Sequence, residues 1–288
     1  MGAFVFVPAR RINLILEAVA LASLLATAVP VRAATQLGNI MPLGDSITQG
    51  VGALGGYREP LYNLLTNGNY AFTFVGSATD YYTSTLTAAG QTHHEGHSGA
   101  TIQNRDPSDP TQSGTFLGGG ILESLPGWIG PGGANPNYIL LTIGTNDIAN
   151  DYYVANAPNR LSNLISAISN RATGLRPNAH LIVAEIPPTG VPVKNAPFKA
   201  FDDALPGIIA GHQSAGENVS LVDLYTPLDP NTDFADGYLH PNIMGDQKIA
   251  AAFYNGITSQ TLAPEPVSLV WIGVGIPLLL MRRRSQRS

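Results

Sequence analysis

The sequence predicts an α/β protein, namely a three-layer α/β/α sandwich with a mostly parallel central sheet. Two patterns along the chain support this fold class. Short apolar segments alternate with segments of helical periodicity, which is typical of repeated strand–helix–strand units. One of the apolar segments, Tyr138 to Ile143, carries no charged residue, and only the hydroxyl side chain of Thr142 lies between its aliphatic residues. Such strands are typically buried on both faces of a parallel sheet.

Five strands are expected, and several of these apolar runs stop at residues that break regular structure. The first ends at the turn Gly44-Asp45-Ser46, the third at Gly144, and the fourth at Pro187-Pro188. Glycine and proline at these points are strong signals for turns and loops. The strands are expected over residues 37–43, 72–75, 138–143, 181–186 and 219–224.

Five helices are expected between and after these strands. Leu161, Leu164, Ile165 and Ile168 recur at helical spacing and predict an amphipathic helix. The helices are expected over residues 57–65, 116–128, 161–175, 196–214 and 243–257. A long polar, Gly-rich region over residues 77–137 contains the second of them.

The chain is predicted to contain one folded domain between two terminal segments. Residues 36–258 show no internal repeat and no linker that would divide them. The predicted organisation is a signal peptide over 1–34, a single domain over 35–258, and a C-terminal sorting segment over 259–288.

The N-terminus has the organisation of a secretory signal peptide. Arg10 and Arg11 precede an apolar run from Ile12 to Ala28, and Val31-Arg32-Ala33 supplies small residues for a signal peptidase. A membrane anchor or a buried helix is the alternative, but the proline and the Ala-rich end favour a cleaved signal. Cleavage after residue 33 or 34 and export of the protein are therefore expected.

The C-terminus carries a second sorting pattern. Pro264-Glu265-Pro266 leads into the apolar stretch Val267 to Met281, which a cluster of arginines follows. This order resembles the PEP-CTERM signal of Gram-negative bacteria, which implies processing by an exosortase-type machinery in the cell envelope. The stretch has about 15 residues, fewer than the roughly 17–25 of a spanning helix. A transient anchor is expected to be the membrane contact, with a simple tail anchor as the alternative.

Composition excludes several classes of function. The sequence contains no cysteine, so it offers no disulfide framework, thiolate metal site or cysteine nucleophile. With both ends removed, eight basic and 18 acidic residues remain, and the net charge is near −10. A surface this negative repels polyanions, so nucleic acid is not an expected partner. Neutral glycans and small esters remain open.

Four short segments, far apart in sequence, together supply the parts of a serine esterase. Acyl transfer needs a nucleophile, a base, a group that orients the base, and donors for the oxyanion. Ser46, His240 and Asp236 suit the first three roles, and Gly99 and Asn146 suit the last. The order Ser, Asp, His is one that known triads use. Ser46, Gly99 and Asn146 follow strands and are expected at the sheet edge where open α/β sheets bind ligands.

Longer stretches around these residues match a known family. They are Ile40 to Gly50, Gly56 to Tyr62, Phe72 to Ser77, His94 to Gly99, Ile139 to Asp147, and His240 to Asn242. On these stretches the chain resembles the GDSL-type, or SGNH, hydrolases, and it is most similar to the acetylxylan-esterase branch of carbohydrate esterase family three. The resemblance covers nearly all of residues 38–256.

The resemblance implies a flavodoxin-like SGNH hydrolase fold and a role for each candidate residue. Ser46 would be the nucleophile, and its backbone N–H would be one oxyanion donor. The backbone N–H of Gly99 and the side-chain amide of Asn146 would be the second and third donors. His240 would be the base and Asp236 its orienting partner. For Asn146, a cap that holds the turn after its strand is the structural alternative.

The spacing between Asp236 and His240 departs from the family pattern. The family places its aspartate three residues before the histidine, whereas Asp236 lies four residues before His240 and Gly237 occupies the expected position. Gly237 could absorb one inserted residue in this loop. Otherwise Asp233 or a backbone carbonyl would orient the histidine.

Other polar and aromatic groups are interpreted as structural. His93, His94, Glu95 and His97 lack the helical spacing of a His-Glu-x-x-His metal site and lie in a Gly-rich loop. They are expected to shape the loop around Gly99, so no metal and no cofactor are predicted.

Asp147 and four tyrosines each leave two interpretations. Asp147 could assist catalysis, but it is expected to brace the loop around Gly99. Tyr81, Tyr82, Tyr152 and Tyr153 could stack on sugar rings or pack under long loops.

The predicted function is an exported or cell-surface serine esterase that removes O-acyl groups, acetyl above all, from a glycan such as xylan. Its partner would be an acylated polysaccharide or a small ester. A lipase, arylesterase or thioesterase on the same scaffold is one alternative. A surface glycan-binding protein without catalysis is another, which the irregular Asp236–His240 spacing keeps open.

Overall fold

The computed structural model describes residues 33–105, 118–129, 132–169 and 179–261. The two predicted sorting segments, 1–34 and 259–288, lie almost entirely outside these residues and remain predictions. Within the described ranges, none of the helices combines the length and apolar character that crossing a membrane requires.

The central sheet confirms the predicted fold class. Its main strands are β1 (Thr35–Gly44), β2 (Tyr70–Phe74), β4 (Tyr138–Thr142), β5 (His180–Ala184) and β6 (Val219–Val222). They lie in the order β2-β1-β4-β5-β6, the two-residue β3 (Glu95–Gly96) pairs with β1, and all these pairings are parallel. Without β3, this is the flavodoxin-like strand order. The chain places β2 on one side of β1 and the later strands on the other side, so the switch point of the sheet lies between β1 and β4.

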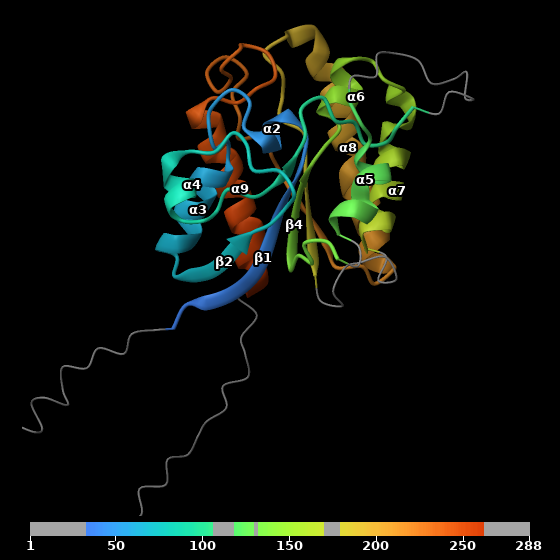
Figure 1. Cartoon of the computed structure of the whole chain (residues 1–288). Coiled ribbons are helices and arrows are strands. Elements are labelled where there is room, and N and C mark those ends of the chain that lie inside the picture. The colour runs from blue at the N-terminus through green and yellow to red at the C-terminus, as the bar shows by residue number, and fades with distance from the viewer. Residues whose placement is uncertain (1–32, 106–117, 130–131, 170–178, 262–288) are drawn as a thin grey trace, which may run out of the picture.

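Helices cover both faces of the sheet (Figure 1). On one face lie α3 (Arg58–Asn67), α4 (Ser84–Ala88) and α9 (Ile243–Thr261). On the other lie α5 (Ile121–Trp128), α7 (Ala157–Ser169) and α8 (Pro192–Ser214). Three short elements complete the order: α2 (Ser46–Gln49), α6 (Thr145–Ala149) and the 3₁₀ turn η1 (Val154–Asn156).

Two hydrophobic cores result, one on each side of the sheet. Side chains of a strand point alternately to its two faces. In β4, Ile139 and Leu141 belong to the core with the helices α5, α7 and α8, whereas Leu140 belongs to the core with α3 and α9. The mainly apolar run of β4 is therefore a strand buried from both sides.

Some predicted boundaries are wrong, and tertiary contacts or local chemistry explain two of them. The helix expected from residue 116 begins at Ile121, because Gly120 pairs with Thr101 in a β-bridge just before it. The helix expected from residue 196 already begins at Pro192, since proline is well suited to the first turn of a helix. Residues 170–175, expected in the helix from 161, lie outside the described residues.

The buried carboxyl groups predict that the free energy of unfolding decreases as the pH rises. Burial raises the pKa of Asp45 to about 7 and the pKa values of Asp202 and Asp246 to about 8. The folded protein therefore holds more protons than the unfolded chain up to these values, and the free energy of unfolding falls as pH rises through them. Burial lowers the pKa of His94 and His180 to about 4. These two histidines make the free energy of unfolding rise with pH, but only below pH 6.5, where they are protonated in the unfolded chain.

Between pH 6.5 and 8, we expect the thermal unfolding midpoint to decrease by on the order of 10 °C. Circular dichroism melts at constant ionic strength would measure it. Asp202→Asn removes one of the titrating groups and should flatten the dependence. A midpoint that rises over this interval would contradict the prediction.

Candidate active site

The candidate residues lie at the carboxyl edge of the sheet, where its strand order reverses. Ser46 begins α2, two residues after β1 ends at Gly44. Asn146 lies in α6, which follows β4, and the two strands are direct neighbours with Gly44 opposite Thr142. Open α/β sheets bind ligands at such a switch point. The fold therefore brings these two residues to one place.

Asp45 fixes the start of α2. Its Oδ1 accepts a hydrogen bond from the N–H of Ile47 at 2.9 Å, which caps the short helix. Asp45 is fully buried and Ser46 is 6% exposed. The serine hydroxyl is thus presented from a rigid, nearly buried turn.

Ser46, His240 and Asp236 form one chain of hydrogen bonds. Ser46 Oγ lies 3.0 Å from His240 Nε2, and His240 Nδ1 lies 2.6 Å from Asp236 Oδ2. An ionised carboxylate only accepts, so Nδ1 carries the proton and Nε2 offers its lone pair to the serine hydroxyl. This is the tautomer that a general base needs.

The loop before α9 holds His240 in position. Asn242 caps α9 because its Oδ1 accepts the N–H groups of Met244 and Gly245 at 2.9 and 3.2 Å. The carbonyl of His240 accepts the N–H of Ala235 at 2.8 Å. Hydrogen bonds therefore hold the backbone at His240 and at the start of α9 just after it.

A turn around the Asp236 carboxylate accommodates the four-residue spacing. Asp236 Oδ1 accepts the N–H groups of Tyr238, Leu239 and His240 at 2.8, 3.0 and 3.2 Å. Gly237 has a φ of +64°, a left-handed conformation that glycine adopts without strain. The chain thus folds back far enough for the His240 ring to reach the other carboxylate oxygen.

The charge of Asp236 is stabilised at the same time. Although partial burial raises its pKa, the backbone N–H of Tyr238 and the His240 ring lower it more, and the net pKa lies below its ordinary value. The alternative partner Asp233 has other contacts. It is fully buried, binds Lys248 Nζ at 2.6 Å and accepts the N–H of Asp229 at 2.6 Å. The structure therefore joins Asp236, and not Asp233, to His240.

Among the described residues, the three candidate oxyanion donors each keep a hydrogen that no acceptor takes. Within the described residues, the backbone N–H groups of Ser46 and Gly99 donate to no acceptor. Gly99 has a φ of +79°. Asn146 donates one amide hydrogen to the carbonyl of Ala100 at 2.9 Å, which leaves its second hydrogen free. The same bond braces the Ala100 loop, whereas the turn after β4 has no side-chain cap, so the alternative role of Asn146 as a cap of that turn is wrong.

Comparisons with known proteins agree with this geometry. Residues 43–248 match the model of the GDSL-like lipase/acylhydrolase family. The chain belongs to this family. A multidomain esterase of Ruminococcus flavefaciens is 29% identical over 238 residues, which are 79% of this chain and 29% of that protein. The chain thus spans about three tenths of the length of this curated relative.

Solved structures give the same picture. A family 3 carbohydrate esterase of Clostridium thermocellum is 34% identical, with a TM-score of 0.60 over 78% of this chain and 98% of that one. A family 3 carbohydrate esterase of Talaromyces cellulolyticus has a TM-score of 0.58 at 23% identity, covering 77% and 97% of the two chains. This GDSL-family chain is thus similar in sequence and fold to a known carbohydrate esterase over most of its length.

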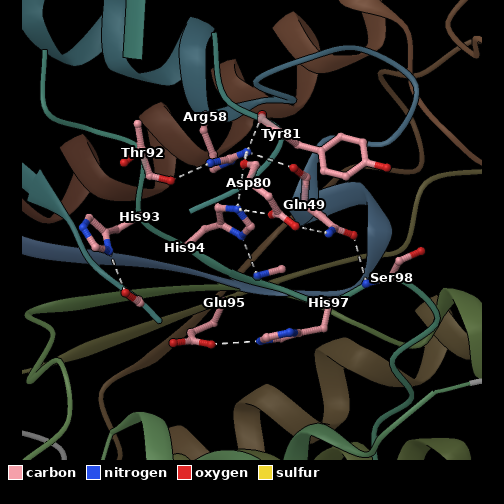
Figure 2. A network of polar contacts seen from close by, with 12 residues as sticks. Gln49, Arg58, Asp80, Tyr81, Thr92, His93, His94, Glu95, His97 and Ser98 are labelled. Carbon is pink, nitrogen blue, oxygen red and sulfur yellow. Dashed lines mark hydrogen bonds and ion pairs between the residues drawn. The ribbon is translucent and has the colours of Figure 1, made fainter. Parts of the chain in front are cut away.

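The histidine-rich loop of this GDSL-family protein is a hydrogen-bond network (Figure 2). His93 Nδ1 lies 2.8 Å from the carbonyl of Gly76, and His97 Nε2 lies 2.9 Å from Glu95. His94 Nε2 lies 3.0 Å from Asp80. These side chains point to separate partners, and the described residues include no group of three or more potential ligands suited to a metal ion.

Asp147 braces the loop that carries Gly99. Its carboxylate accepts the N–H of Ile102 at 3.1 Å and pairs with Arg160 Nη1 at 2.6 Å, and both side chains are buried. This matches the bracing interpretation.

The four tyrosines fall into two groups. Tyr152 is 1% exposed and packs under the Arg160 guanidinium, 4.7 Å from the ring centroid, so stacking on a sugar is wrong for it. Tyr153 also lies beside Arg160, at 5.6 Å. Tyr81 and Tyr82 are 41% and 48% exposed and remain accessible.

Two residues near the site were not recognised from the sequence. Arg58 is fully buried, although arginine at the start of a helix normally indicates a surface position. Gln49, at the end of α2, connects Asp80 to Ser98. The only sequence signal for either is that both lie in stretches that resemble the family. Their partners are main-chain or distant groups that a pattern of residue types does not specify.

Proposed function

We propose that the protein is an exported serine esterase that removes acetyl groups from a glycan such as xylan. The hydrogen-bonded chain from Ser46 through His240 to Asp236 carries the catalytic part of the proposal. The 34% identity to a family 3 carbohydrate esterase, over almost the whole length of that protein, supports the choice of a glycan ester. The two sorting patterns of the sequence support export.

The first half of the reaction acylates Ser46. As Ser46 Oγ attacks the ester carbonyl, its proton moves to His240 Nε2, and Asp236 stabilises the resulting imidazolium. Negative charge develops on the carbonyl oxygen and is bound by the N–H groups of Ser46 and Gly99 and the amide of Asn146. His240 then donates the proton to the departing glycan oxygen. A free hydroxyl and an acyl-serine result.

The second half releases the acid. A water molecule gives its proton to His240 Nε2 while its oxygen attacks the acyl carbon, and the same three donors hold the oxyanion. The bond to Ser46 Oγ breaks, the oxygen takes the proton back from His240, and acetate leaves. The cycle needs only the groups described and a water molecule.

An acyl-chain series tests this function. We expect the highest kcat/KM on 4-nitrophenyl acetate, a decline from acetate to octanoate, and release of acetate from acetylated xylan. Acetylated pectin and chitin fragments would serve as comparison polymers. A preference for chains longer than butyrate would instead indicate a lipase, and activity on aryl esters without any acetate release from the polymers would indicate an arylesterase.

The geometry at Asp236 argues against the alternative of a binding protein without catalysis. The irregular spacing to His240 was the feature that favoured a binding protein, and the turn around Asp236 supports a working orientation instead. Failure of a fluorophosphonate to label Ser46 in the folded protein would restore that alternative.

A further inference from the structure

Gln49 links the helix that carries Ser46 to the loop that carries Gly99. It is the last residue of α2, which Ser46 begins. Its Nε2 donates to Asp80 Oδ2 at 2.9 Å, and its Oε1 accepts the backbone N–H of Ser98 at 3.1 Å. Figure 2 shows the side chain between these two partners. Ser98 directly precedes Gly99, so one amide bridges the two segments.

The orientation of this amide is set by its surroundings. His94 Nδ1 accepts the N–H of Gly96 at 3.0 Å, so the proton of the neutral ring lies on Nε2. That nitrogen donates to the main-chain carbonyl of Asp80 at 3.1 Å and lies 3.0 Å from Asp80 Oδ1. The Asp80 carboxylate thus lies beside the His94 ring N–H, and as a carboxylate it can only accept the hydrogen bond that it shares with Gln49. The amide of Gln49 must direct its nitrogen to Asp80 and its oxygen to Ser98.

Arg58 fixes the backbone at Gln49 and beside Asp80, on one side of the bridge. Its Nη2 donates to the carbonyls of Gln49 and Tyr81, each at 2.8 Å, and its Nη1 donates to the carbonyl of Thr92 at 3.3 Å. The guanidinium is buried and holds the end of α2 against the loop that contains Asp80. The bridge thus starts from a rigid frame.

The loop itself has few other restraints at this point. The N–H of His97 donates to the carbonyl of Gly44 at 2.9 Å, and the N–H of Ala100 donates to the carbonyl of His97 at 3.0 Å. Between these bonds Ser98 is exposed and Gly99 adopts a positive φ. Gln49 supplies the acceptor for the N–H of Ser98. Within the described residues, this is the one peptide N–H between His97 and Ala100 that makes a hydrogen bond.

We propose that Gln49 is a positioning residue that aligns the Gly99 N–H with the oxyanion through Ser98. This inference rests on the proposed function, in which Gly99 is an oxyanion donor. An oxyanion forms only during the reaction, so poor alignment should lower kcat and change KM little. Removal of a whole oxyanion donor costs about 10²–10³-fold in kcat, and misalignment of one donor should cost less.

The test is a polarity swap at the Gln49–Asp80 contact, measured on 4-nitrophenyl acetate. Gln49→Ala should lower kcat about tenfold with KM within about twofold. Gln49→Glu should be equally slow at pH 7.5, because two carboxylates would face each other. Asp80→Asn should be slow as well, because two amide donors would meet.

The double variant Gln49→Glu with Asp80→Asn should restore kcat to within about threefold of the wild type. The new amide at position 80 would donate to the carboxylate at position 49, while its amide oxygen would lie beside the His94 ring N–H. The carboxylate at position 49 would still accept the N–H of Ser98. A purely structural contribution of Gln49 to stability would not produce this recovery of kcat.

Gln213→Ala is the matched control. Gln213 also makes one side-chain bond to a main-chain group, the carbonyl of Val219 at 2.9 Å, but it lies in α8. It should leave kcat unchanged. Wild-type kcat in Gln49→Ala, or a double variant as slow as Gln49→Glu, would overturn the positioning role while Ser46→Ala still abolishes activity. A wild type without esterase activity would overturn the proposed function itself, and this inference with it.

Discussion

Replacement of Ser46 by alanine should lower kcat on 4-nitrophenyl acetate by at least about 10⁴-fold and leave the fold intact. The hydroxyl is the group that His240 Nε2 contacts at 3.0 Å, and without it the acyl-enzyme cannot form. The remaining oxyanion donors still bind the carbonyl, so some rate above the uncatalysed reaction should persist. Initial rates and a thermal melt on the same preparation would measure both effects.

Ser214→Ala is a suitable control for this substitution. The Ser214 hydroxyl donates only to the carbonyl of Ala210 in its own helix, at 2.8 Å, so its loss should not change the rate. A fluorophosphonate should label the wild type and the control but not Ser46→Ala. Normal hydrolysis by folded Ser46→Ala would exclude Ser46 as the nucleophile.

The fold could be predicted because its signals are local and repeated. The strands β4 and β5 are almost entirely apolar, and α7 shows its periodicity over several turns. The short helices α2 and α6 could not be predicted, because four or five residues are too few to show a period. The start of α5 depends on the bridge between Thr101 and Gly120, which is a tertiary contact.

In the candidate site, too, some residues could be assigned from the sequence and others could not. Ser46 and Asn146 could be assigned because each follows a strand within a specific motif, and the parallel sheet then brings both to one edge. The Asp236–His240 contact could not be decided from spacing, since it depends on the left-handed conformation of Gly237. Gln49 and Arg58 remained unrecognised because main-chain carbonyls and N–H groups, which nearly every residue has, are among their main partners.

Replacement of Asp236 by asparagine should produce the second large loss, about 10³–10⁴-fold in kcat. The amide oxygen can still accept the N–H groups of Tyr238 and Leu239, so the loop should keep its shape. The amide nitrogen would then face His240 Nδ1 and favour the ring with its proton on Nε2. That nitrogen would point a hydrogen at Ser46 Oγ and could not accept the serine proton.

Asp233→Asn separates this effect from a general loss of charge in the same loop. Asp233 pairs with Lys248 and accepts the N–H of Asp229, and neither contact reaches His240. We expect Asp233→Asn to lower the thermal unfolding midpoint and leave kcat within about threefold of the wild type. The two variants should thus fail in opposite ways, one in rate and one in stability. If Asp233→Asn instead lost the rate and Asp236→Asn kept it, the orienting carboxylate would be Asp233, and the 2.6 Å contact at Asp236 would have no catalytic meaning.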